Sequence, residues 1–161
     1  QRQMCIRDRL NIMNEVLLML NNAFFNSFIG VYRPYTKLTQ PILDKHDIHT
    51  GQWLVLRDIA NFQPTTLAKI SNRRSIEKPT TRKIVKVLLD NKWISTEQGS
   101  DKREKLLRLT TEGQALFETI NKEISVIQKD IIKKVGLTEA QLTEITKVMS
   151  QIHETLIKEE K

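Results

Sequence analysis

The 161-residue sequence has a single cysteine, Cys5, together with only five glycines and four prolines. One cysteine cannot form a disulfide within the chain, which excludes a disulfide-rich scaffold and favours a reducing compartment such as the cytoplasm. The low glycine and proline contents exclude collagen-like and low-complexity chains. A globular fold is therefore expected, since a chain of this length can bury about 70% of its unfolded surface.

Long apolar runs are also missing. The longest, residues 16–20, is far shorter than the stretch of about 20 residues that a membrane-spanning helix needs. Asp8 and Asn11 interrupt the apolar segment that a secretory signal would require. The sequence therefore predicts a cytoplasmic protein without a membrane partner.

The short motifs of common catalytic chemistry are absent as well. There is no P-loop, no G-x-G-x-x-G, no H-E-x-x-H and no G-x-S-x-G. His46 and His49 lie three residues apart with Asp44 and Asp47 beside them. These four residues do not complete a clear tetrahedral set, so a polar loop or pocket wall is favoured over a metal site. We predict neither an enzyme, nor a cofactor, nor a bound metal.

Positive charge, by contrast, is concentrated in one part of the chain. The formal net charge is +7, and residues 69–108 hold twelve of the 26 lysines and arginines but only five of the 19 acidic residues. This block therefore carries the whole excess, and the rest of the chain is neutral. Such a block is typical of a site for a polyanion, and the alternative is a solvated basic face.

Apolar residues recur at helical spacing near the N-terminus. The pattern predicts a helix over residues 10–32 that Pro34 ends, because proline lacks a backbone donor and crowds the preceding turn. A shorter helix is expected over residues 36–44, followed by a polar loop. Thr50 is then expected to cap a further amphipathic helix.

The last fifty residues predict two more helices. The first is expected to start at a capping box in residues 111–114 and to end at Gly136. The second is expected to start at another capping box in residues 137–142. The apolar stripes at the two ends of the chain exceed what a small domain can cover, which favours a dimer over a monomeric helical bundle.

The basic block predicts a helix, a tight turn and a second helix. The first helix covers about residues 66–73 and is capped by Thr66. The turn takes residues 74–76. The second helix covers residues 78–91 with Pro79 in its first turn, where the missing N–H has no helical partner. One face of this helix is apolar and the other carries cations.

After this helix the apolar period changes to about two. Residues 93–97 and 105–109 are expected to be short strands joined by a turn with a basic tip. A helix-turn-helix followed by such a hairpin is the order of a winged helix-turn-helix. A helix fits the major groove of duplex DNA, and an arginine on a hairpin tip fits the minor groove. Double-stranded DNA is therefore the predicted partner.

At this point the sequence resembles the MarR family of bacterial transcriptional regulators, over roughly residues 10–157. Residues 76–81 resemble the start of the family's recognition helix, and residues 46–56 resemble its entry into the third helix. The wing carries the most specific part of the resemblance. The residues similar to the family's wing signature are Asp101, Lys102 and Arg103, followed by Leu109, Thr110 and Gly113.

The resemblance implies a mainly α fold with a small β-hairpin wing. Residues 46–111 would form the winged helix-turn-helix DNA-binding domain, and residues 1–45 and 112–161 the helical dimerisation region. The implied function is that of a homodimeric repressor that binds a palindromic operator and releases it when a small ligand arrives. An alternative is a winged-helix module that binds RNA or an acidic protein.

The resemblance also implies roles for single residues. Those expected to face the major groove are Lys78, Pro79, Thr80, Arg82, Lys83 and Lys86. Those expected at the minor groove are Asp101, Lys102, Arg103 and Lys105, with Asp101 holding Arg103. Those expected at the DNA backbone are Arg73, Arg74 and Ser75. Arg74 and Ser75 depart from the apolar residue and the glycine that are frequent in the family, which puts the turn geometry in doubt.

A ligand pocket between the dimerisation and DNA-binding parts is a further implication of the resemblance. The residues expected to line it are Tyr32, Arg33, His49 and Trp53. Trp53 could equally be a plain core residue. A redox role for Cys5 is not favoured, because the sensing cysteine of some family members would be expected near Phe24 or Phe25.

Overall fold

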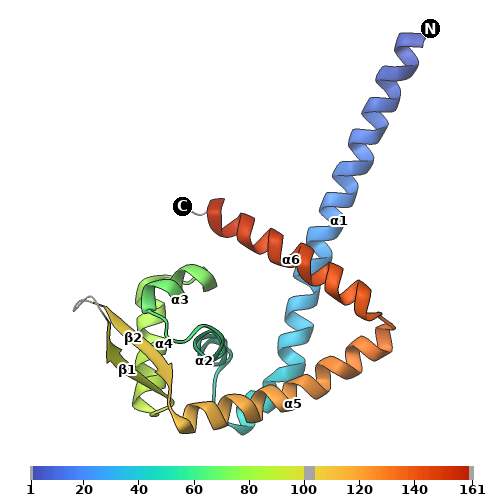
Figure 1. The fold of residues 1–161 in the computed structure, drawn as a ribbon. Coiled ribbons are helices and arrows are strands. Elements are labelled where there is room, and N and C mark those ends of the chain that lie inside the picture. The colour runs from blue at the N-terminus through green and yellow to red at the C-terminus, as the bar shows by residue number, and fades with distance from the viewer. Residues whose placement is uncertain (1, 100–103, 160–161) are drawn as a thin grey trace. The chain divides into compact units, whose positions relative to one another are not determined.

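The computed structural model describes residues 2–99 and 104–159 of the chain. The described residues form six helices and two strands (Figure 1). In chain order the elements are α1 (Arg2–Lys45), α2 (Thr50–Phe62), α3 (Leu67–Arg74), α4 (Lys78–Asp90), β1 (Ile94–Gln98), β2 (Lys105–Leu109), α5 (Thr111–Val135) and α6 (Glu139–Glu159). This confirms the prediction of a mainly helical fold with a hairpin wing.

The chain divides into two compact units, residues 1–40 and residues 41–161. The first unit holds the greater part of α1, whose last residues belong to the second unit, and α1 is one continuous helix through Pro34. The prediction that Pro34 ends a helix and that a second one covers residues 36–44 was therefore wrong. A proline inside a helix costs about 3 kcal/mol, but regular helix on both sides of it offsets that cost.

The core of the second unit is built around α2. Val55, Leu56 and Ile59 on this helix are fully buried, and α2 packs against α3, α4, α5 and β2. In Figure 1, α2, α3 and α4 lie together beside the β1–β2 hairpin. The other buried apolar residues of this core are Leu43, Ile48, Trp53, Ile70, Val85, Leu88, Ile94, Leu107, Ile120 and Ile124.

The two strands form an antiparallel pair in which Ile94 lies opposite Leu109 and Gln98 lies opposite Lys105. Thr65 extends this sheet by a single bridge to Leu107. The Thr65 N–H donates to the Leu107 carbonyl at 3.2 Å, and the Leu107 N–H donates to the Thr65 carbonyl at 2.7 Å. The segment before α3 is therefore hydrogen-bonded to the middle of β2.

Helix caps confirm some of the predicted boundaries and shift others. Thr66 caps α3 as predicted, and Gly136 ends α5 in the left-handed region with φ of 75°. The capping box before α6 is present, since Thr138 and Gln141 exchange hydrogen bonds.

Two predicted caps were wrong by one residue. Thr110, rather than Thr111, caps α5 by accepting from the Gly113 N–H at 3.0 Å. His49, rather than Thr50, is the N-cap of α2. Neighbouring threonines and polar residues offer similar caps, and only the packed backbone selects among them.

No helix within the described residues is long and apolar enough to cross a lipid bilayer.

Candidate nucleic-acid interface

The turn between α3 and α4 is closed by two hydrogen bonds between Ser71 and Ile76. The Ile76 N–H donates to the Ser71 carbonyl at 3.0 Å, and the Ser71 hydroxyl donates to the Ile76 carbonyl at 2.5 Å. Ser75 takes the left-handed conformation with φ of 47°, where glycine would be less strained. The turn follows Arg74, the last residue of α3, so it begins one residue later than predicted.

Helix α4 has one face in the core and the other in solvent. Thr81, Val85 and Leu88 are buried on the inner face, which agrees with the predicted separation of an apolar face from a cationic one. The residues predicted to face the major groove are all exposed, namely Lys78, Pro79, Thr80, Arg82, Lys83 and Lys86. Four cations therefore share the outer face of a helix that is held rigidly by its inner face.

The part of the wing that the structure describes includes its two strands, β1 and β2. Arg108 on β2 donates to Glu97 on β1 across the pair, with 3.1 Å between Nε and Oε2. Lys105, predicted to lie near the minor groove, is exposed at the start of β2. Asp101, Lys102 and Arg103 lie outside the described residues, so their roles at the wing tip stay predictions.

Arg73, predicted to contact the DNA backbone, is bound to other residues of the protein, and its contact with DNA stays a prediction. Its Nε donates to Oδ1 of Asp58 at 3.1 Å, and its Nη2 donates to Oδ2 of Asp58 and to the Thr65 hydroxyl. Its guanidinium also lies 4.4 Å from the centre of the Phe62 ring. The Asp58 carboxylate is only 5% exposed, so it requires a charged partner. Sequence pattern alone gave no sign of this pairing, because the two residues lie on different helices.

Arg74 is partly buried and Ser75 is exposed. Their predicted contacts with the DNA backbone stay predictions.

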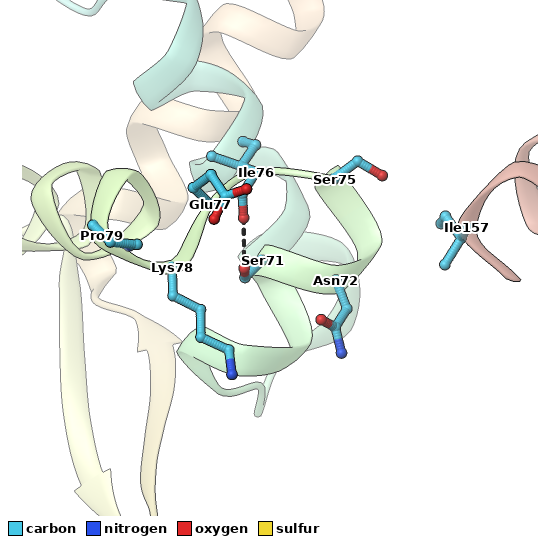
Figure 2. Close-up of a pocket in the computed structure, with 8 residues that line it drawn as sticks. All are labelled: Ser71, Asn72, Ser75, Ile76, Glu77, Lys78, Pro79 and Ile157. Carbon is cyan, nitrogen blue, oxygen red and sulfur yellow. Dashed lines mark hydrogen bonds between the residues drawn. The ribbon is translucent and has the colours of Figure 1, made fainter. Parts of the chain in front are cut away.

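An open hollow of about 710 Å³ lies at the start of α4 (Figure 2). The residues that line it are Ser71, Asn72, Ser75, Ile76, Glu77, Lys78, Pro79 and Ile157. Figure 2 shows the hydrogen bond between Ser71 and Ile76 in its wall. Sequence reasoning missed this hollow, because its shape depends on the folded turn and on a residue from the distant helix α6.

The residues predicted to line a ligand pocket have different environments. Trp53 is 3% exposed and stacks on Phe117 at 5.7 Å between ring centres, so the interpretation of Trp53 as a core residue is confirmed. Tyr32 and Arg33 are exposed on α1, and His49 is exposed at the start of α2. Their place in a pocket stays a prediction.

His46 takes part in an ion-pair cluster that joins the end of α1 to α5. Its Nε2 lies 2.9 Å from Oε1 of Glu123, and Nζ of Lys45 lies 3.1 Å from the same oxygen. The hydrogen bond from His46, followed by that from Lys45, lowers the pKa of Glu123 below its ordinary value of 4.5. Within the described ranges, no group of three or more histidine, cysteine or acidic residues is arranged to hold a metal ion.

A helix, a tight turn, a second helix with an exposed basic face and a two-stranded hairpin together define a winged helix-turn-helix protein. Residues 48–105 match the model of the MarR family. Over 142 residues the chain is 52% identical to an uncharacterized HTH-type transcriptional regulator of Staphylococcus aureus strain MRSA252, covering 88% of this chain and 97% of that protein. The chain therefore belongs to the MarR family of transcriptional regulators.

Solved structures agree with this assignment. The native MarR of Staphylococcus aureus is 52% identical, with a TM-score of 0.80 over 87% of this chain and 99% of that one. A Staphylococcus aureus MarR in complex with salicylate and kanamycin, also 52% identical, gives a TM-score of 0.77 over 88% and 95% of the two chains. The chain is thus a DNA-binding transcriptional regulator, and its family is one of regulators rather than enzymes.

Proposed function

We propose that the chain is a homodimeric repressor that binds a palindromic operator and releases it when a small ligand binds. The observation that carries the proposal is the exposed basic face of α4, which follows a rigid turn and precedes a hairpin. A helix presented in this way fits the major groove, where its first residues meet base edges.

In this proposal the DNA contacts divide by groove. The residues assigned to the major groove are Lys78, Pro79, Thr80, Arg82, Lys83 and Lys86. Those assigned to the minor groove are Asp101, Lys102, Arg103 and Lys105. Arg74 and Ser75 are assigned to phosphates beside the turn. Arg73 is not used, because Asp58 already holds its guanidinium.

The proposed dimer rests on apolar side chains at both ends of the chain. Helix α6 has no buried residue, although Ile145 and Leu156 are among its apolar side chains. The apolar side chains of α1 that are more than 40% exposed in the single chain include Ile12, Met13, Val16, Leu17, Leu20, Phe24 and Phe28. An amphipathic helix must bury its apolar face, and monomers seldom expose so large a patch. We therefore assign residues 1–45 and 112–161 to contact with a second copy.

The proposed effector is a small molecule. A Staphylococcus aureus MarR at 52% identity has been solved in complex with salicylate and kanamycin, which supports a small-ligand site in this chain as well. Tyr32, Arg33 and His49 are the exposed residues that we assign to it. Salicylate is expected to lower the affinity for the operator, measured by titration of a preformed protein–DNA complex.

Selection of genomic DNA fragments by the purified full chain tests the proposal. The expected product is a palindrome with two half-sites whose centres lie about 34 Å apart. Affinity for that duplex should fall with salt, with a log–log slope of about −0.9 for each phosphate neutralised. Stronger binding to structured RNA or to an acidic protein, at matched salt, would reverse the proposal in favour of an interaction module.

Two variants locate the contacts. Arg82→Ala is expected to weaken operator binding and to relax specificity at one position, by about 1–3 kcal/mol if this arginine contacts a guanine. Arg103→Ala is expected to weaken binding with less change in the selected sequence, because the minor groove distinguishes fewer base pairs. Equal affinity of both variants and the wild type would contradict the assigned contacts.

A further inference from the structure

Glu77 stands out as an acidic residue in the middle of the basic surface. It is the only acidic residue between residues 59 and 89, a stretch that contains seven lysines and arginines. Its side chain is exposed immediately before α4, whose outer face carries Lys78, Arg82 and Lys83. A carboxylate at this point repels DNA phosphates, so it lowers the affinity for duplexes in general.

The position of Glu77 is fixed by its backbone. The Glu77 carbonyl accepts from the Thr81 N–H at 2.9 Å and from the Thr81 hydroxyl at 3.2 Å. The preceding residue, Ile76, is held by the hydroxyl of Ser71. Thr81 and Ser71 are both buried, so the turn presents the Glu77 side chain from a rigid base.

The Glu77 side chain does not serve the helix that it precedes. Glu77 is the N-cap residue of α4, yet its side chain makes no capping hydrogen bond. Serine, threonine, aspartate and asparagine are the usual caps. Among the residues that the structure describes, Glu77 also has no ion-pair partner. Glu77 is instead one of the residues that line the open hollow at the start of α4 (Figure 2), and its side chain is exposed.

We propose that Glu77 is a specificity-determining residue that accepts a hydrogen bond from the exocyclic amino group of a cytosine in the major groove. This inference rests on the proposed function, since it requires α4 to lie in that groove. The first residues of a recognition helix are those that meet base edges. A local departure from good capping is also expected at a functional site more than elsewhere.

The choice of cytosine follows from hydrogen-bond chemistry. An ionised carboxylate only accepts hydrogen bonds. In the major groove guanine presents two acceptors, thymine presents an acceptor and a methyl group, and adenine presents a donor beside an acceptor. Cytosine is the base that presents a donor without a neighbouring acceptor. Glu77 therefore favours cytosine and opposes the other three bases.

The test is selection from a randomised duplex library by the full chain and by two variants. The wild type should select cytosine at one symmetric pair of positions, with a preference of about five- to hundredfold, the range of a single mismatched base pair. Glu77→Gln should shift that preference to adenine, because glutamine can bond adenine through both a donor and an acceptor. Glu77→Ala should lose the preference and bind unrelated duplexes more tightly at low salt.

Glu112→Gln is the matched control, because it removes another exposed acidic side chain from the first turn of a helix, α5. It should leave the selected sequence unchanged. Melting curves of all variants verify folding, and Glu77→Ala provides the second variant if Glu77→Gln does not fold.

Two outcomes overturn the inference in distinguishable ways. If the wild type selects a palindrome and the Glu77 variants select the same bases, the role of Glu77 is wrong while the proposed function stands. If the wild type selects no duplex, the proposed function fails and this inference fails with it.

Discussion

At the scale of single residues, the ion pair between Asp58 and Arg73 shows how function and stability compete for the same side chain. Arginine in a basic block is expected to meet phosphate, yet Asp58 is almost fully buried and its charge must be compensated. Arg73 compensates the charge of the Asp58 carboxylate with hydrogen bonds from two of its nitrogens, and one of these nitrogens also donates to the Thr65 hydroxyl. Thr65 in turn pairs with Leu107 of the wing. The pair thus helps to fix α2, α3 and β2 together.

Arg73→Ala is expected to destabilise the fold by about 3 kcal/mol, because it leaves a buried carboxylate without its cation. Urea denaturation at fixed protein concentration measures the change. The double variant Asp58→Ala/Arg73→Ala should cost less than the sum of the two single variants, since the interaction energy is lost only once. Normal stability of Arg73→Ala together with weaker duplex binding would restore Arg73 to the DNA interface.

At the scale of elements, Gly113 governs how α5 leaves the hairpin. A Cβ at this position would lie 1.8 Å from the Trp93 carbonyl oxygen, so no side chain fits between the helix and the start of the wing. The obstacle is backbone, which cannot rotate away as a flexible side chain can. The close approach of α5 to Trp93 therefore requires glycine.

Gly113→Ala is expected to lower stability by roughly 3 kcal/mol or more, since overpacking against backbone forces the elements apart. Gly51→Ala in α2 is the matched control, because its Cβ would lie 3.7 Å from the Ile84 side chain, an ordinary contact. The control should be neutral or slightly stabilising. Thermal melting of the two variants measures the difference, and equal melting temperatures would contradict the packing argument.

The same scale shows what could be predicted from the sequence. The hairpin followed from a change of apolar period, and the capped ends of α3 and α5 followed from Thr66 and Gly136. Those signals are local, so a single sequence contains them. The prediction that a helix ends at Pro34 was wrong, because the cost of a proline inside a helix is outweighed by the regular helix on both sides of it. The pairing of Arg73 with Asp58 could not be predicted, because the two residues lie on different helices and no local pattern records that contact.

The candidate site shows the same division. The exposure of the predicted α4 residues was predictable, because helical period separates Thr81, Val85 and Leu88 from the cations. The hollow beside Glu77 was not predictable, because it exists only once the turn has folded.

The cluster of Glu123, His46 and Lys45 predicts that stability depends on pH on the acid side. The lowered pKa of Glu123 means that the folded state holds this carboxylate in its charged form more strongly than the unfolded chain does. Its contribution is therefore present above the ordinary value of 4.5 and is lost as the pH falls through the lowered pKa.

Glu123→Gln is expected to flatten the acid side of the stability profile while changing the slope near pH 7 little. Urea midpoints measured from pH 3 to pH 7 test this expectation. Glu144→Gln, which removes an exposed carboxylate from α6, is the control. If both variants keep the acid limb of the wild type, the cluster does not contribute to it.

At the scale of the whole molecule, charge and apolar surface occupy different parts of the chain. The net charge of +7 arises within residues 69–108, whereas the exposed apolar side chains are most frequent on α1, with others on α5 and α6. One part is therefore suited to a polyanion and the other to an apolar partner. In the proposed dimer, the apolar parts hold two basic parts at a fixed separation, and the two contacts bind one duplex together.

This division predicts that a charge on α1 weakens DNA binding without touching DNA. Phe28 is 50% exposed in the single chain, and Phe28→Glu places a charge in the proposed contact between copies. Asn22→Glu adds the same charge to α1 at an exposed polar position outside the set of exposed apolar side chains on which the contact rests, so it should leave the dimer intact. Light scattering during gel filtration should give a monomer for Phe28→Glu and a dimer for the control.

Measuring duplex binding by Phe28→Glu tests whether operator binding requires a dimer or only one copy. A monomer offers one winged helix, so Phe28→Glu should bind the full palindrome about as weakly as the wild type binds an isolated half-site. The loss arises because the second contact is no longer made at a high effective concentration. The salt slope should also fall by about half, since half as many phosphates are neutralised. A monomeric variant that kept wild-type affinity and slope would show that one copy suffices for binding, and the palindrome would then lose its physical basis.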